Sequence, residues 1–153
     1  MIFVTVATSS YDILIKAMDR HVGSGKISDS VIAQIGLGEY EPKNMRYFRF
    51  IESLDAAYDK AEVIVSTGGA GTTLECVSRG LNLVSVENTS LMEGHQSELI
   101  GELESRGHLI WCKNLERLPQ CIDEARSKTF APFKPNPPTV HKRIIDFLTG
   151  IHE

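Results

Sequence analysis

The stretch VIVSTGGAGTTLECVSRG, residues Val63–Gly80, is the part of the sequence that decides the fold. It begins with a short run of β-branched residues, which is typical of a buried strand. A turn with three glycines within four residues follows, and after it comes a helical pattern at Thr72–Arg79. Gly80 can end that helix in a left-handed conformation. The stretch therefore predicts one strand–turn–helix unit of an α/β protein.

The same alternation of strand and helix patterns continues on both sides of this unit. Strands are predicted at Ile2–Val6, Ser30–Ile35, Met45–Phe50, Glu62–Val65, Leu83–Val86 and His108–Cys112. Helices are predicted at Asp12–His21, Leu54–Lys60, Thr72–Arg79, His95–Arg106 and Leu115–Ser127. The apolar face of the first helix is expected to hold Ile13, Leu14, Ala17 and Met18. This alternation predicts a Rossmann-like parallel sheet with helices on both faces.

Length and composition indicate a single soluble domain. The 153 residues are enough for one substantial core, and the apolar fraction of 42 % and charged fraction of 24 % are ordinary for a globular protein. The net charge of −4 argues against a nucleic-acid binder. The first apolar run is too short for a signal peptide. No segment has the roughly 20 apolar residues of a membrane span, so a cytoplasmic protein is expected.

The three cysteines, Cys76, Cys112 and Cys121, form no C-x-x-C pair. Their spacing indicates neither a disulfide framework nor a zinc site. Each cysteine is therefore expected to pack as a small apolar residue in a reducing compartment.

The segment FAPFKPNPP, residues 130–138, marks the one change of composition along the chain. Its four prolines cannot continue a helix or join a central strand. We interpret it as a connector to a last amphipathic helix at 139–150. That helix is expected either to pack back on its own domain or to dock on a partner protein.

The glycine turn lies where an open parallel sheet binds its ligands, outside the carboxyl ends of the strands. Gly68, Gly69 and Gly71 permit positive φ values and a close approach of a ligand to the backbone. Thr72 and Thr73 stand where the next helix presents free N–H groups. The G-x-G-x-x-G and P-loop fingerprints are absent, and no lysine is available for a triphosphate. The turn therefore favours a diphosphate held by main-chain and hydroxyl groups.

Three further positions near this edge have two interpretations each. Glu75 suits the hydroxyl pair of a ribose, or it only complements the helix dipole. The hydroxyl residues Thr8–Ser10 after the first strand either hold phosphate oxygens or supply a serine N-cap. His95 and Gln96, at the start of a later helix, could bind sugar hydroxyls. Alternatively, His95 is a structural or solvent-facing histidine.

Three separated stretches together resemble a known family. FVTVATSSYDILI, FIESLDAAYDKAEVIVSTGGAGTTLE and SLMEGHQSELIGELESRGHLIWC are similar to the C-terminal, donor-binding half of family-28 glycosyltransferases. In particular, they resemble the small catalytic subunit of the two-part UDP-GlcNAc transferase of dolichol-linked oligosaccharide assembly. Small subunits of bacterial split exopolysaccharide glycosyltransferases are similar too. The resemblance covers residues 1–115 and implies one half of a GT-B enzyme.

The resemblance implies a UDP-sugar as the donor substrate, with neither a cofactor nor a metal. Main-chain amides and helix N-termini then hold the leaving diphosphate. The loop Ala7–Ser10 would contact the phosphates, the backbone of Ile51 the uracil, Glu75 the ribose, and Gln96 with His95 the sugar. The donor-binding residues implied are Ala7, Thr8, Ser9, Ser10, Ile51, Thr67, Gly68, Gly69, Ala70, Gly71, Thr72, Thr73, Glu75, His95 and Gln96.

Two positions depart from the family pattern. Ala7 stands where relatives usually have a glycine, and an alanine narrows the backbone choices of that loop. Thr67 stands where relatives often have a histidine or arginine beside the phosphates. The loss of this charge is expected to weaken leaving-group stabilisation unless a partner supplies a cation.

The resemblance also implies a reaction and a partner. The reaction is inverting transfer of GlcNAc, another hexose or a uronic acid to a lipid-linked acceptor. A general base must take the acceptor proton, and His95 and Glu87 are the candidates in this chain. In relatives, the base and the acceptor site lie largely on the other half. A membrane-anchored partner subunit with the acceptor-binding half is therefore implied, and it would hold this chain at the cytoplasmic membrane face. The helix at 139–150 is expected to form part of the interface.

Three other functions stay open from the sequence. The chain could be a non-catalytic UDP-sugar or nucleotide-binding regulatory module, and Thr67 and the missing base favour this alternative. It could also be a fragment of a UDP-sugar epimerase, although such enzymes normally have both halves in one chain. An NAD-binding domain is the third alternative, but the glycine fingerprint is absent. The sequence does not determine the sugar, the acceptor, the linkage or the oligomeric state.

Overall fold

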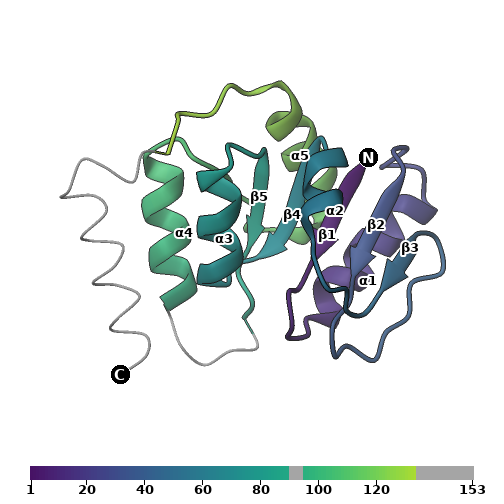
Figure 1. The fold of residues 1–153 in the computed structure, drawn as a ribbon. Coiled ribbons are helices and arrows are strands. Elements are labelled where there is room, and N and C mark those ends of the chain that lie inside the picture. The colour runs from purple at the N-terminus through teal and green to yellow at the C-terminus, as the bar shows by residue number, and fades with distance from the viewer. Residues whose placement is uncertain (90–94, 134–153) are drawn as a thin grey trace.

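Six parallel strands of the described chain form one sheet, and helices cover both of its faces (Figure 1). The computed structural model describes residues 1–89 and 95–133, with residue 95 described by its backbone alone. The connector beyond Phe133 and the helix predicted at 139–150 lie outside the described residues. Within the described residues, no helix is long and apolar enough to cross a membrane.

The strands and helices follow the predicted alternation, with shifted bounds. The strands are β1 (Ile2–Thr5), β2 (Val31–Gln34), β3 (Arg46–Phe48), β4 (Val63–Thr67), β5 (Leu83–Val86) and β6 (Ile110–Trp111). The helices are α1 (Asp12–Gly23), α2 (Asp55–Lys60), α3 (Ala70–Ser78), α4 (His95–Ser105) and α5 (Leu118–Ser127). A 3₁₀ turn, η1 (Leu115–Arg117), precedes α5, so the helix predicted over Leu115–Ser127 is divided. Pro119 in the first turn of α5 explains the division, since proline lacks the N–H that a continuous helix needs.

The strand order β3-β2-β1-β4-β5-β6 confirms the Rossmann-like prediction. Every pair of neighbouring strands is parallel, and Val4 of β1 lies between Ala33 of β2 and Val65 of β4. The order runs one way from β1 to β3 and the other way from β4 to β6. The switch point, where ligands bind in such sheets, is therefore between β1 and β4.

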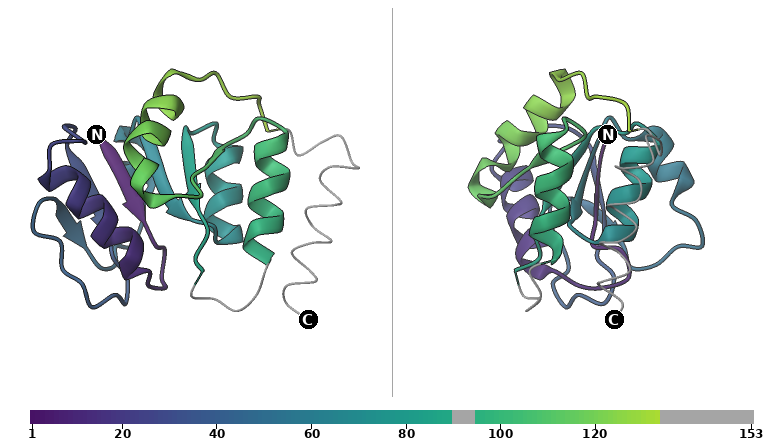
Figure 2. Two further views of the ribbon diagram at one scale, coloured as in Figure 1. Left: turned by 180° about the vertical axis from the view of Figure 1, so that it is seen from behind. Right: turned by 90° about the vertical axis from the view of Figure 1, so that its left-hand side faces the viewer.

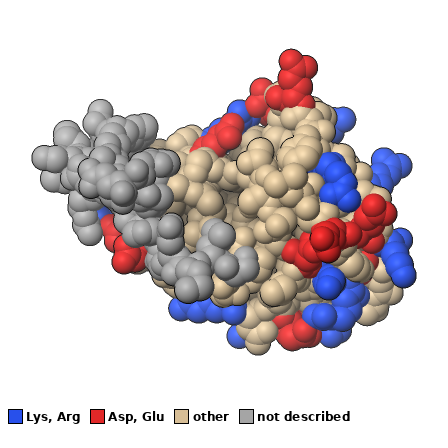
Figure 3. Space-filling view, turned by 90° about the horizontal axis from the view of Figure 1, so that it is seen from below, with Lys and Arg blue, Asp and Glu red and all other residues tan. Residues whose placement is uncertain are grey.

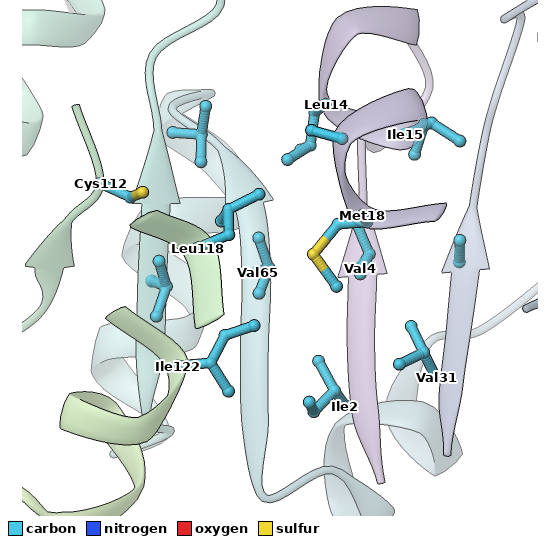
Figure 4. Packing of buried hydrophobic residues seen from close by; sticks show 14 of the residues in the cluster. Ile2, Val4, Leu14, Ile15, Met18, Val31, Val65, Cys112, Leu118 and Ile122 are labelled. Atoms are coloured by element: carbon cyan, nitrogen blue, oxygen red, sulfur yellow. The ribbon is translucent and has the colours of Figure 1, made fainter. Parts of the chain in front are cut away.

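The side chains of the strands alternate between two buried clusters, one on each face of the sheet. Ile2 and Val4 belong to the cluster that α1 and α5 cover, whereas Phe3 belongs to the cluster that α2, α3 and α4 cover. Figure 2 shows α1 and α5 on one side of the sheet and α2 and α3 on the other. In Figure 4, Met18 of α1 lies beside Val4, and Leu118 of α5 lies beside Val65. Burial of each large apolar side chain stabilises the fold by about 1.5–3 kcal/mol.

The prediction for the first helix is wrong at one position. Ile13 is 53 % exposed, whereas Leu14, Ile15, Ala17 and Met18 are buried. Leu14 and Ile15 of the same turn are fully buried, so the face that packs on the sheet is centred on these residues and on Met18 one turn later, and Ile13 lies outside it. The buried face of α1 therefore includes Ile15 in its place.

Glycines end two of the helices as the sequence predicts. Gly80 has a φ of 72° and Gly107 a φ of 79°. After α3, the N–H groups of Gly80 and Leu81 donate to the carbonyls of Val77 and Cys76. The same pair of bonds ends α4, and this arrangement is the Schellman motif. Both helices are thus stopped at the amino-terminal edge of the sheet, away from the switch point.

The cysteines pack as the sequence predicts. Cys76, Cys112 and Cys121 are all free thiols, and the first two are buried in the clusters on opposite faces of the sheet. Burial raises the pKa of Cys76 to about 12, so this thiol stays protonated at neutral pH.

Candidate functional site

The loops after β1 and β4 come together at the switch point, because these two strands are neighbours in the sheet. The first loop runs from Val6 to Ser10, and the second is the glycine turn at Gly68 and Gly69. Figure 3 shows this edge of the molecule: uncharged residues occupy its centre, and the Lys, Arg, Asp and Glu side chains lie around them.

The glycine turn does not use the conformational freedom of its glycines. The glycines with positive φ among the described residues are Gly25, Gly36, Gly80 and Gly107. Gly69 has a φ of −61° and a ψ of 135°, and α3 begins directly after it at Ala70. The expected positive φ values in this turn are therefore wrong, and Gly71 is a helical residue.

The glycines of the turn differ in what surrounds them. A Cβ on Gly68 would lie within 3.0 Å of the Ile100 Cδ1 and the Gln96 Oε1, so Gly68 allows α4 to approach β4. A Cβ on Gly69 or Gly71 would meet nothing within 4 Å. These two glycines leave the N-terminus of α3 open, and the first three N–H groups of that helix have no acceptor inside it. Such an open helix start suits an anion.

The threonines around the turn are less accessible than the sequence predicts. Thr73 is fully buried, and its N–H already donates to the Gly69 carbonyl at 3.0 Å. It therefore offers no free N–H to a ligand, and its hydroxyl does not reach the surface. Thr67 is only 6 % exposed at the end of β4. Thr72 is half-buried, so it is more accessible than Thr73, the other threonine of α3.

The first loop turns sharply at Ala7. Its φ of 56° is the one positive value at a non-glycine residue among the described residues. The Thr5 hydroxyl accepts the Ala7 N–H at 2.9 Å, and the N–H and hydroxyl of Ser9 both donate to the Val6 carbonyl. The N-cap of α1 is Tyr11, which makes no side-chain cap bond, so the serine N-cap interpretation is wrong. Thr8–Ser10 are exposed instead.

Substitution of Ala7 by glycine is expected to stabilise the fold by about 0.5–1 kcal/mol. The left-handed conformation costs an L-residue about 1–2 kcal/mol, and glycine does not have this cost. Glycine also makes the unfolded chain more flexible, which offsets part of the gain in stability. Thermal and urea unfolding of the Ala7→Gly variant measure the change. Ala56→Gly, at an exposed position of α2, is the matched control and should destabilise by about 1 kcal/mol. Destabilisation by both variants would contradict the left-handed conformation at Ala7.

The loop after β5 bridges to the first loop over the end of β4. The Asn88 side-chain amide donates to the Ser10 carbonyl at 3.3 Å, and the hydroxyls of Tyr11 and Thr89 lie 3.0 Å apart. The backbone N–H of Asn88 donates to the Gln96 Oε1 at 2.8 Å. This bond leaves the amide nitrogen of Gln96 as the part of the side chain that could donate to a sugar.

Glu87 directly precedes Asn88 in the loop after β5. It is half-buried and lines a cavity of 470 Å³ together with Tyr11, Ile13, Thr89 and Lys113, among other residues. His95 is the first residue of α4, and its side chain is outside the described part of the structure. Among the described residues, no three His, Cys, Asp or Glu side chains gather as they would around a metal ion.

Glu75 is held by an ion pair. Its Oε1 accepts the Arg79 Nη2 at 3.0 Å, and the same nitrogen donates to Asp55 of α2 at 2.6 Å. The Arg79 guanidinium also lies 5.2 Å above the ring centre of Tyr58 and holds the pKa of the Asp55 carboxyl below its usual value. Glu75 is beyond the first turn of α3, so complementing the helix dipole does not explain it. Ile51, in the loop before α2, is 57 % exposed to solvent.

Some residues that build this edge had no signal in the sequence. Gly36 packs against the first loop, Arg49 binds the turn that contains Gly36, and Asn88 joins the loops after β1 and β5. Each contact joins segments that are far apart in the chain.

Comparisons with known proteins show the family of this chain. The model of the glycosyltransferase family 28 C-terminal domain matches residues 1–143. The chain is 35 % identical to the UDP-N-acetylglucosamine transferase subunit ALG13 of Homo sapiens over 144 residues, which are 87 % of this chain and 12 % of the relative. It is 32 % identical, over 67 % of its length, to the UDP-N-acetylglucosamine--N-acetylmuramyl-(pentapeptide) pyrophosphoryl-undecaprenol N-acetylglucosamine transferase of Thermotoga neapolitana, of which it covers 32 %.

A solved structure supports the same assignment at the level of the fold. The solution structure of ALG13 superposes with a TM-score of 0.61 and 16 % identity, covering 95 % of this chain and 94 % of that one. The chain spans well under two thirds of the curated relatives described above. The sheet order, the open glycine turn and the family match agree, and the chain belongs to the glycosyltransferase family 28 C-terminal domain family.

Proposed function

We propose that this chain is the donor-binding, catalytic subunit of a two-component inverting glycosyltransferase. It would transfer a sugar from a UDP-sugar to a lipid-linked acceptor. The observation that carries the proposal is the open start of α3 beside the exposed first loop, at the switch point of a family 28 domain. The human relative is named a UDP-N-acetylglucosamine transferase subunit, which supports UDP-GlcNAc as the first donor to test.

The donor would lie along the carboxyl edge of the sheet. Ile51, beyond β3, would meet the uracil with its backbone, and the diphosphate would lie between the first loop and the start of α3. Glu75 would accept the ribose hydroxyls. Its Oε1 accepts a hydrogen bond from Arg79 at 3.0 Å, which orients the carboxylate, and a carboxylate has acceptor sites for both hydroxyls. Gln96 would turn its amide nitrogen toward the transferred sugar.

The reaction needs a base and a stabilised leaving group. The acceptor hydroxyl attacks the anomeric carbon, the bond from that carbon to UDP breaks, and the hydroxyl proton passes to a general base. Main-chain N–H groups at the start of α3 would stabilise the charge that develops on UDP. Glu87 and His95 are the candidate bases of this chain, and Glu87 already lines a cavity at this edge. No cofactor and no metal enters this scheme.

A partner would complete the enzyme. The human relative is named a transferase subunit, which supports an assembly with another chain. We propose a membrane-anchored partner subunit that presents the lipid-linked acceptor at the cytoplasmic membrane face. A non-catalytic UDP-sugar-binding regulatory module is the alternative, and one observation favours it. Thr67, which stands where relatives often have a cation, is nearly buried.

Binding of UDP to the isolated chain tests the donor assignment. At ten times its Kd, UDP should add about 1.4 kcal/mol to the free energy of unfolding, which raises Tm by roughly 3–6 °C for a domain of this size. We expect Glu75→Gln to weaken UDP binding about tenfold. Glu116→Gln, which removes an exposed carboxylate paired with Arg20, should not change it. Equal shifts of Tm with UDP, ADP and NAD would contradict the donor assignment. Sugar transfer in the presence of a partner subunit would distinguish an enzyme from a regulatory module.

A further inference from the structure

The peptide between Ser9 and Ser10 has a fixed direction in the first loop. The Ser9 carbonyl accepts the N–H of Leu37, in the turn after β2, at 3.0 Å. The C=O and N–H groups of a trans peptide point in opposite directions, so the Ser10 N–H points away from the β2 turn. The strand β4, and with it the switch point, lies on the side of β1 opposite β2. No acceptor within residues 1–89 and 95–133 binds this N–H.

The turn after β2 packs against the first loop through backbone alone. Gly36 has a φ of 57°, and a Cβ at this position would lie 2.1 Å from the Ser9 carbonyl oxygen and 3.2 Å from that of Ala7. A side chain at residue 36 would therefore push the turn away from Ser9. Only glycine allows the carbonyl of Ser9 and the N–H of Leu37 to meet as they do.

Arg49 holds this turn from the other side. Its Nη1 donates to the carbonyls of Gly36 at 3.1 Å and Gly38 at 2.6 Å. Its Nη2 lies 3.6 Å from the Glu41 carboxylate, which helps to fix the guanidinium. Arg49 directly follows β3, and β3 lies beside β2 in the sheet. A planar guanidinium that bridges two carbonyls fixes the curvature of the 36–38 turn.

We propose that Arg49 is a positioning residue for the diphosphate of the donor. It holds the 36–38 turn, the turn holds the Ser9 carbonyl, and the Ser10 N–H is thereby aimed at a phosphate oxygen. This inference rests on the proposed function, because that function assigns the phosphates to the first loop. Its consequence is specific to phosphate: Arg49 contributes to the affinity for UDP and not to the affinity for uridine.

The experiment compares UDP with uridine on four forms of the full chain by calorimetry and by amide NMR. The forms are the wild type, Arg49→Gln, Arg49→Lys and the matched control Arg46→Gln, which changes an exposed arginine of β3. We expect Arg49→Gln to weaken UDP binding about tenfold and uridine binding less than twofold, with an intermediate result for Arg49→Lys. Arg46→Gln should match the wild type for both ligands.

The chemical shift of the Ser10 amide distinguishes a positioning role of Arg49 from a purely structural one. In the wild type, this resonance should shift downfield with UDP and not with uridine, and in Arg49→Gln the shift should be lost. The wild-type measurement stands even if Arg49→Gln does not fold. Unchanged UDP affinity in a folded Arg49→Gln, equal losses for UDP and uridine, or a silent Ser10 resonance in the UDP-bound wild type would each overturn the inference. Absence of any UDP binding to the wild type would instead overturn the proposed function, and the inference with it.

Discussion

Replacement of Asp19 by asparagine is expected to lower the free energy of unfolding at pH 7 by about 2–3 kcal/mol, and Tm by roughly 5–10 °C. Asp19 is only 2 % exposed on α1. Its carboxylate accepts the Tyr40 hydroxyl at 2.5 Å and the backbone N–H groups of Lys43 at 3.0 Å and Asn44 at 2.7 Å. Asparagine keeps the volume but turns an NH₂ group toward these donors, so at least one buried donor loses its acceptor.

The effect of Asp19 depends on pH in a defined direction. Burial alone would raise its pKa, but the hydrogen bonds from Tyr40 and the two amides outweigh burial, so the pKa of Asp19 lies below its usual value. The carboxylate therefore stabilises the fold fully above the unfolded pKa of about 4. This contribution is lost as the pH falls through the lower pKa of the folded state. The difference between wild type and Asp19→Asn should accordingly shrink below about pH 4.

Urea unfolding at several pH values measures both effects. Asp123→Asn is the matched control, because this aspartate is 76 % exposed in its side chain and its ion pair with Arg126 is 3.7 Å long. Exposed pairs of this kind contribute about 0–1 kcal/mol. A loss of stability in Asp19→Asn no larger than in the control would contradict the buried network. Equal losses at pH 3 and pH 7 would show that the charge of Asp19 does not contribute.

The network around Asp19 also matters for the site. Residues 40–44, which it holds against α1, connect the 36–38 turn to β3, and Arg49 follows β3 directly. The stretch 36–44 is therefore held by Arg49 at its 36–38 turn and by Asp19 at residues 40–44. If Arg49 positions the first loop as proposed above, the stability of this segment and the alignment of that loop depend on the same stretch of backbone.

Most of the fold follows from local patterns in the sequence. The short β-branched runs and the glycine helix stops each act within about ten residues, so strands, helices and the parallel sheet could be predicted. Ile13 was misplaced, because it shares the four-residue spacing of Ala17 but lies outside the face that Leu14, Ile15 and Met18 bury. The start of α3 at Ala70 was also missed, since three neighbouring glycines suggested a longer turn than the chain makes.

The edge of the sheet that holds the candidate site could be predicted, but not the contacts that shape this edge. Strands that alternate with helices bring their carboxyl ends to one edge, which is why the first loop and the glycine turn were both identified. The pairs Gly36 with Ser9, Asn88 with Ser10 and Glu75 with Arg79 depend on how distant elements pack. Their geometry is set by the whole sheet, so a single sequence contains no local signal for the first two. The third pair had the helical spacing of four residues and could have been noticed.

Substitution of Gly68 by alanine is expected to destabilise the fold by about 1–3 kcal/mol, because the new methyl group overfills a packed site. A Cβ there would lie within 3.0 Å of the Ile100 Cδ1, and Ile100 is fully buried. Ile100→Val removes that methyl group and alone should cost about 0.5–1.5 kcal/mol. The double variant should lose clearly less than the sum of the two single losses, and chemical unfolding of all four forms measures the coupling. Additive losses would contradict the contact between Gly68 and Ile100.

Gly71→Ala should have the opposite sign, although Gly71 is only three residues away. A Cβ at Gly71 meets nothing within 4 Å and the residue is helical, so alanine should stabilise the free chain by about 0.5–1 kcal/mol. The same methyl group would stand over the amides that the proposed function gives to the diphosphate, so UDP binding should weaken as the free chain becomes more stable. A gain in stability with unchanged UDP affinity would place the diphosphate away from α3. The two substitutions thus distinguish the roles of the two glycines. Packing against Ile100 requires Gly68, whereas only a ligand bound at the start of α3 would require Gly71.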